Sequence, residues 1–124
     1  MITRSDNIQV IATLRQEVEA SQTVHAELDD SQARGARLEE QLFQLVNAFS
    51  REVADFLAIV AAGNSSQDQL LAATKQMQET QMSFNLQYLQ LQSQMQHENR
   101  SYTAISNLMK TKHDTVKNSI GNIR

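Results

Sequence analysis

Histidines and paired carboxylates are the side chains of this sequence that could carry out chemistry. The histidines are His25, His97 and His113, and the carboxylate pairs are Asp29 with Asp30 and Glu39 with Glu40. A zinc site draws ligands three or four positions apart from several segments, and these histidines do not have that spacing. A catalytic carboxylate needs burial or a like-charge neighbour to raise its pKa, whereas these pairs lie in polar stretches. We expect solvated side chains and no metal site.

Motifs for catalysis are missing from the sequence. It has no glycine-rich phosphate loop, no Gly-x-Ser-x-Gly turn and no His-Glu-x-x-His pair. It has no cysteine, which excludes disulfides and thiolate metal sites but leaves both secretion and a cytosolic location open. We therefore predict that the protein is not an enzyme and that it uses no cofactor.

The composition predicts an all-α fold. The 124 residues include no proline and only three glycines, the two residues that most disfavour a helix interior. A single clear break runs from Ala61 to Ser66, with Gly63 suited to a helix C-terminus. Ser65 or Ser66 suits the N-cap of the next helix, and Ser66 with Gln69 suits a capping box. We predict one domain, residues 1–124, folded as an antiparallel, coiled-coil-like helical hairpin with arms at 6–62 and 66–120 and a turn at 63–65. The polar stretch from Ser31 to Gly35 leaves open a three-helix alternative.

A seven-residue apolar ladder indicates that the two arms pack lengthwise against each other. Apolar residues at alternating steps of three and four are typical of helices that share a seam. The ladder ends at Ile123. The predicted seam consists of Leu42, Leu45, Phe49, Val53, Phe56, Leu70, Met77, Phe84, Tyr88, Leu91, Met95, Tyr102, Ile105, Met109 and Val116.

Glu98 and Lys112 occupy ladder positions within this seam. Polar groups in a seam can set the register of two helices at a cost in stability. The alternative interpretation is that both side chains turn outward to solvent near a fraying end.

Apolar residues outside the seam predict an assembly interface. Leu86 and Leu89 point about 140–200° away from the seam at 100° per residue, and Phe43 and Ile59 also lie off it. A two-helix hairpin covers only one face of each helix, so these four residues need a partner. The segment from Thr80 to Gln96 carries no formal charge and is rich in glutamine. Glutamine is also an ordinary surface residue of helices, so that segment alone does not decide between the interpretations.

The distribution of charge argues against some partners and for others. The net charge is −3, with −5 in residues 1–62 and +2 in residues 63–124, which favours attraction between the arms or between neighbouring copies. The few lysines near the end are too sparse for binding nucleic acid. Arg51, Glu52 and Asp55 interrupt the most apolar stretch, so we expect no membrane span. No cleavable export signal is visible after Met1.

The last third of the sequence contains Leu86–Ser93, Asn99–Tyr102, Ser106–Lys110 and the ending Ser119–Arg124, an amphipathic stretch with many glutamines and serines that closes on an Ile-x-Asn-x-Arg-like tail. In these residues it resembles the C-terminal helix of type III secretion extracellular proteins of the filament and needle-tip class. The resemblance implies export without a cleaved signal and polymerisation of coiled-coil hairpins. Residues 1–60 show no specific match, and the inserted domain that many of these proteins carry between their arms is missing.

These features lead to three hypotheses of function. In the first, the protein is a structural subunit of a filament or needle-like polymer, secreted or at the cell surface, that self-associates through the apolar faces of both helices. Its expected partners are then other copies of itself and a secretion chaperone. In the second, it is a small secretion chaperone or adaptor that holds a helical client, or a cytoplasmic partner of such a system. In the third, it is a scaffold coiled coil with no role in transport.

Overall fold

The computed structural model describes residues 4–122, which form two α-helices, α1 (Arg4–Ala61) and α2 (Gln67–Gly121). The prediction of an all-α hairpin of two helices packed against each other is confirmed. Helix α1 continues through Ser31 and Gly35 without interruption, so the three-helix alternative is wrong. The helix ends differ from the predicted arms by one or two residues, and Ile123 lies outside the described residues.

In the turn between the helices, Gly63, Ser66 and Gln69 have the roles that the sequence predicted. Gly63 has a φ of +70°, a left-handed conformation that other residues adopt only at a cost. Ser66 and Gln69 form a reciprocal capping box: the Gln69 backbone N–H donates to Ser66 Oγ at 3.1 Å, and the Ser66 N–H donates to Gln69 Oε1 at 2.9 Å. These bonds satisfy two amide groups at the start of α2 that have no partner within the helix.

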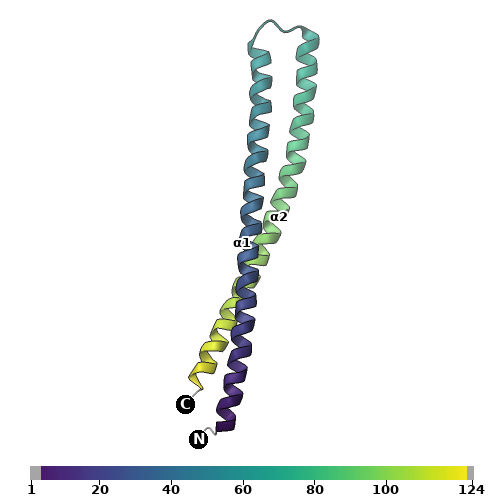
Figure 1. Ribbon diagram of the computed structural model, residues 1–124. Helices are drawn as coiled ribbons and strands as arrows, with labels where there is room; N and C mark the ends of the chain where they lie inside the picture. Colours follow the sequence, from purple (N-terminus) through teal and green to yellow (C-terminus); the bar gives the residue numbers. More distant parts are fainter. Residues whose placement is uncertain (1–3, 123–124) are drawn as a thin grey trace. The chain divides into compact units, whose positions relative to one another are not determined.

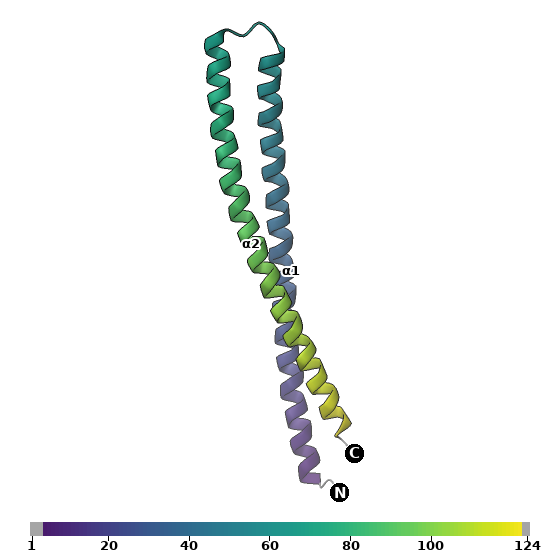
Figure 2. The same cartoon turned by 180° about the vertical axis from the view of Figure 1, so that it is seen from behind.

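The chain forms two compact units. Unit 1 contains α1 up to Gly35 and α2 from Glu98 onward, and unit 2 is Ala36–His97, including the turn. Within each unit the two helical segments lie side by side in both views of the ribbon (Figures 1 and 2). Each unit is therefore a pair of antiparallel helices with its own seam.

The most buried residues of unit 1 lie on one face of α1. Val24, Leu28 and Ser31 are buried, and Ser31 is only 1 % exposed. Their spacing of four and three residues places them on one face, and the half-buried positions of α2 in this unit include Tyr102 and Ile105. A serine at the most buried position indicates a polar layer in an otherwise apolar seam.

The seam of unit 2 departs from the regular heptad at an aromatic cluster. Phe49 and Phe84 stack across the seam with ring centroids 4.4 Å apart, and Tyr88 stacks on Phe84 at 5.9 Å. Two successive four-residue steps occur here on both helices. On α1 they join Leu45 to Phe49 and Phe49 to Val53, and on α2 one step leads to Phe84 and the next leads from Phe84 to Tyr88. An extra four-residue step locally unwinds a coiled coil. Both helices contain the step beside the same aromatic pair, so their seams shift together.

Candidate functional site

The predicted seam residues lie at or beside the contact between helices. In unit 2, Tyr88 is the exposed member at 39 %, although its ring stacks on Phe84. The other seam residues of unit 2 are half-buried: Leu42, Leu45, Phe49, Val53, Phe56, Leu70, Met77, Phe84, Leu91 and Met95. In unit 1 the half-buried seam residues are Tyr102, Ile105, Met109 and Val116. Half-burial is what a two-helix pair can provide, because each helix has only one neighbour.

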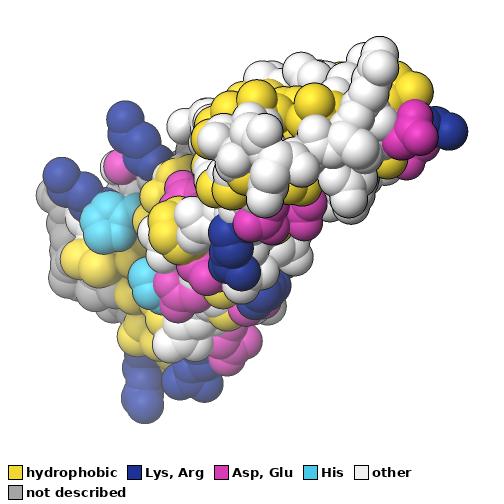
Figure 3. All heavy atoms as spheres, turned by 90° about the horizontal axis from the view of Figure 1, so that it is seen from above, with side chains coloured by type: hydrophobic (Ala, Val, Ile, Leu, Met, Phe, Trp, Pro, Cys, Tyr) yellow, Lys and Arg dark blue, Asp and Glu magenta, His cyan; other side chains and the backbone are white. Residues whose placement is uncertain are grey.

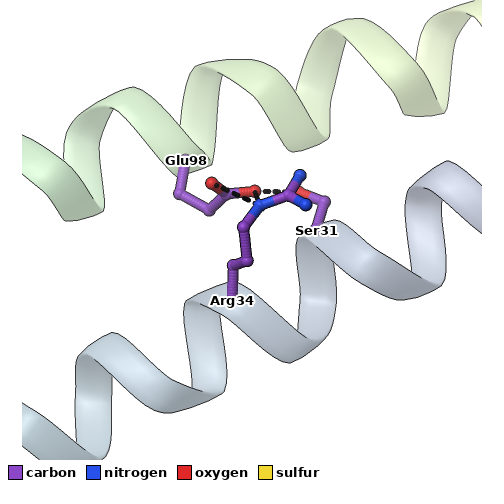
Figure 4. A network of polar contacts seen from close by, with 3 residues as sticks. All are labelled: Ser31, Arg34 and Glu98. Carbon is purple, nitrogen blue, oxygen red and sulfur yellow. Dashed lines mark hydrogen bonds and ion pairs between the residues drawn. The ribbon is translucent and has the colours of Figure 1, made fainter.

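Glu98 is the centre of a polar cluster in the seam of unit 1 (Figure 4). Its side chain is 12 % exposed, and Oε1 accepts a 2.6 Å hydrogen bond from Ser31 Oγ. Arg34 Nε donates to both carboxylate oxygens at 3.1 Å. A half-buried carboxylate is tolerated here because two donors from α1 replace the water that it loses.

The same contact determines how Arg34 titrates. The hydrogen bond to Glu98 raises the pKa of Arg34, partial burial opposes the rise, and the negative charges of Glu98 and Asp30 add to it. A basic group whose pKa is raised on folding stabilises the fold below its ordinary pKa and loses that contribution only when the pH exceeds the raised value. The contribution of Arg34 is therefore constant through the neutral range.

Lys112 forms the second polar layer of unit 1. Its ammonium lies 3.3 Å from a carboxylate oxygen of Glu17, and both side chains are less than one-third exposed. Glu17 precedes Ser31 by two heptads on α1, and Lys112 follows Glu98 by two heptads on α2. The two polar layers therefore specify the same antiparallel register. Of the two interpretations for Glu98 and Lys112, contact across the seam is the one that the structure supports.

The four predicted assembly residues are all exposed, although Ile59 also lines a small cavity formed by residues of both helices. Leu86, Phe43 and Leu89 are exposed at 64 %, 61 % and 59 %, and Ile59 is exposed to a lesser extent. Met82, Leu86 and Leu89 follow one another at steps of four and three, so they adjoin on one face of α2 opposite its seam. We call these three residues the outer stripe.

The surroundings of the outer stripe contain few charges. It lies within the uncharged segment from Thr80 to Gln96. Figure 3 looks down on the turn end of unit 2, where hydrophobic side chains lie at the surface and acidic and basic side chains appear at the edge of this end. Large contiguous apolar patches are uncommon on monomers and mark interaction sites when they occur.

An open groove between the helices of unit 2 was not anticipated from the sequence. It has a volume of about 480 Å³, and its lining combines the apolar side chains of Leu45, Phe49 and Phe84 with polar ones that include the carboxylates of Glu52 and Glu79. A second cavity of about 240 Å³ shares Glu52 with it and adds Asp55 and Ile59. Phe49 and Phe84, the aromatic pair at the extra four-residue step, form part of the lining of the groove. The adjacent four-residue steps are the feature of the sequence that could have indicated the groove.

The candidate chemical residues lie at the surface. His25, His97 and His113 are exposed, as are both carboxylate pairs. His25 Nε2 is 3.9 Å from Asp29 on the same helix, an exposed contact of little energetic consequence. Among residues 4–122, no group of three or more histidine, aspartate or glutamate side chains is placed to hold a metal ion. Neither helix, over its described length, has a stretch long and apolar enough to cross a membrane.

Comparison of the chain with protein-family models, with curated proteins and with solved structures gives no match. The candidate site is therefore defined by its geometry: a packed seam, an exposed outer stripe and a groove.

Proposed function

We propose that the protein is a structural subunit that self-associates through the exposed apolar surface of unit 2. The observation that carries the proposal is the outer stripe, with Leu86 and Leu89 more than half exposed on a face that has no charged residue between Thr80 and Gln96. Burying a large apolar side chain contributes about 1.5–3 kcal/mol, and the hairpin itself leaves this gain unrealised. A second copy supplies an equivalent apolar surface.

The class of assembly that fits best is a helical polymer of the filament or needle type. Two observations support it: the subunit is a helical hairpin, and residues 86–124 resemble the C-terminal helix of type III secretion extracellular proteins. On this proposal the chain is exported without a cleaved signal and acts outside the cell or at its surface. Exposed apolar residues on both helices, Phe43 on α1 and Leu86 on α2, supply more than one contact surface per subunit.

The proposal is tested by placing charge on the outer stripe. The double variant Leu86→Glu with Leu89→Glu is expected to remain helical by circular dichroism and to sediment as a 14.0 kDa monomer under conditions in which the wild type assembles. The matched control is Gln81→Glu with Gln94→Glu, which adds the same charge to exposed positions of the same segment that are not one turn from any residue of the stripe, and it is expected to assemble like the wild type. Assembly of the stripe variant at wild-type mass would contradict the proposal.

The groove of unit 2 favours a second candidate, a small chaperone or adaptor that binds a helical client. Its open side, and a lining in which apolar residues lie beside polar ones, are features of a site for an amphipathic helix. Purification from the native source separates the two candidates. One helical client in fixed stoichiometry with no homopolymer favours the chaperone, and homopolymer without a client favours the structural subunit.

A further inference from the structure

Helix α1 of unit 2 carries a second apolar row beside the seam. Phe43, Val46, Leu57 and Val60 are between 42 % and 61 % exposed. The row is completed by Ser50 and Val53, and its steps alternate between three and four residues. This is the spacing of a helix face that packs lengthwise on another helix. We call these six residues the flank stripe.

The flank stripe and the groove lie on opposite sides of the seam. At 100° per residue, the flank stripe lies about 20–120° round α1 from Phe49 in one direction. Arg51, Glu52 and Asp55 lie about 60–160° from Phe49 in the other direction. Glu52 and Asp55 line the groove or its adjoining cavity, whereas no residue of the flank stripe lines either one. The charged side chains of this part of α1 therefore lie away from the flank stripe.

The two exposed stripes of unit 2 are both free of formal charge. No residue of the flank stripe is charged, and Glu39 lies one turn before its first residue. The outer stripe lies within the uncharged segment from Thr80 to Gln96, and Glu79 lies just before that segment. A contact between the two stripes therefore brings no like charges together along its length.

The spacing of the two stripes also matches. The residues of the outer stripe follow one another at steps of four and three. The second half of the flank stripe, from Val53 to Val60, has the same two steps, and the first half, from Phe43 to Ser50, has them in reverse order. Side chains of one helix can fill the gaps of another when their steps agree. The outer stripe therefore fits the flank stripe in a parallel or an antiparallel alignment.

The area of the two stripes is sufficient for a specific contact. Their seven exposed apolar side chains are between 42 % and 66 % exposed, which leaves on the order of 700 Å² of apolar surface to cover. The smallest specific interfaces bury about 1,200 Å² in total, of which somewhat more than half is apolar. The two stripes together supply the apolar part of an interface of that size.

We propose that the outer stripe of one copy packs on the flank stripe of a second copy. This contact rests on the proposed self-association and identifies the surface that covers the outer stripe. Within one chain the outer stripe lies on the side of α2 opposite the seam, so it does not reach α1 of the same chain. Pairing two outer stripes would cover three residues of each copy and leave the flank stripe in water.

The geometry of this contact determines what it builds. Two different surfaces meet, so the interface is heterologous, and a bound pair still has one free outer stripe and one free flank stripe. Repetition of such a contact gives a ring when the rotation closes and an open helical filament when it does not. The contact therefore accounts for growth beyond a dimer.

Disulfide trapping tests the contact directly, because the wild-type chain contains no cysteine. Single-cysteine variants are made at exposed positions: Val46→Cys and Leu57→Cys on the flank stripe and Leu86→Cys on the outer stripe. A disulfide requires Cα atoms within about 7 Å of each other. Leu86 meets Val46 in the antiparallel alignment and Leu57 in the parallel one.

The expected result is a covalent dimer that forms only in a mixture. Under mild oxidation, Leu86→Cys mixed with one of the two flank variants should give about tenfold or more covalent dimer than any variant alone, because docking raises the effective concentration of the two thiols. The flank variant that reacts identifies the alignment. The matched control is Ala48→Cys, at an exposed position on the groove side of α1, which should not react with Leu86→Cys.

A second measurement does not depend on thiol chemistry. Val46→Glu with Leu57→Glu places charge on the flank stripe and should weaken association by sedimentation about tenfold or more, with helical content unchanged by circular dichroism. Association of this variant at wild-type strength would overturn the contact.

The contradicting results separate this contact from the proposed function. Covalent dimers of Leu86→Cys alone would show that outer stripes pair with each other, which overturns the contact and keeps self-association. The contact is also wrong if no mixture reacts while the mass of the wild type rises with concentration. A monomeric wild type overturns both proposals.

Discussion

Arg34 binds the carboxylate of Glu98 across the seam of unit 1, where its Nε donates to both carboxylate oxygens at 3.1 Å. Ser31, one turn earlier on α1, donates to the same carboxylate at 2.6 Å. A charged layer in a helical seam is weak evidence for added stability, but it specifies which residues lie opposite each other. Together with Glu17 and Lys112, it holds the two helices of unit 1 in one register.

Two serines of α1 should respond in opposite directions to replacement by alanine. Ser31→Ala removes the partner of a half-buried carboxylate and should lower the free energy of unfolding by about 1–2 kcal/mol. Ser21→Ala should be neutral or stabilising by up to about 1 kcal/mol, because Ser21 Oγ is buried without a hydrogen-bond partner and alanine is the better helix former. Urea titration followed by circular dichroism measures both. Equal losses of unfolding free energy in the two variants would show that the hydrogen bond from Ser31 to Glu98 does not stabilise the fold.

Lys112 and Glu17 should behave as an energetically coupled pair. Glu17→Lys alone places two ammonium groups together and should lower stability by about 0.5–1 kcal/mol, and Lys112→Glu should do the same with two carboxylates. The double reversal restores opposite charges in the same register. A double-mutant cycle of thermal unfolding should therefore show the double variant to be more stable than either single variant. Additive losses would contradict the contact.

Two glycines offer a matched test of backbone conformation. Gly63→Ala places a residue with a Cβ atom in a left-handed backbone conformation, and it should lower the free energy of unfolding by about 1–2 kcal/mol. Gly35→Ala lies inside α1 with no atom within 4 Å of the added methyl, and it should stabilise by about 0.5–1 kcal/mol. Denaturant midpoints of the two variants should shift in opposite directions. A stabilising Gly63→Ala would mean that the turn does not have the described conformation.

Local chemistry made the turn and the helices predictable from the sequence. Gly63 is suited to a positive φ, and Ser66 with Gln69 is a known pairing at a helix start, so neighbouring residues alone contain the signal. The heptad steps likewise indicated which residues face the other helix. Such features depend on residues within one or two helical turns.

Which residues of α1 contact Glu98 and Lys112 depends on the register of two distant segments, and these partners were not predicted. The signal was present: Asn64 and Ser65 lie midway between Ser31 and Glu98, and also midway between Glu17 and Lys112. Reflecting the sequence about the turn would have paired Ser31 with Glu98 and Glu17 with Lys112. Arg34 is a less direct case, since it reaches Glu98 from one turn beyond the reflected position.

The groove was also missed, for a different physical reason. A regular heptad predicts a uniform seam, whereas the extra four-residue steps beside Phe49 and Phe84 shift the packing locally. Exposure of Leu86 and Leu89 was anticipated because helical periodicity places them away from the seam. What covers those residues depends on a second molecule, and the periodicity of one chain does not identify it.

The most direct measurement of the central claim is the mass of the wild-type protein by static light scattering across a wide range of concentration. Exposed apolar residues that are covered by neighbouring copies should produce a mass above 14.0 kDa that rises with concentration. A constant mass of 14.0 kDa up to the highest concentration reached, with full helical content, would contradict self-association and the filament function proposed from it.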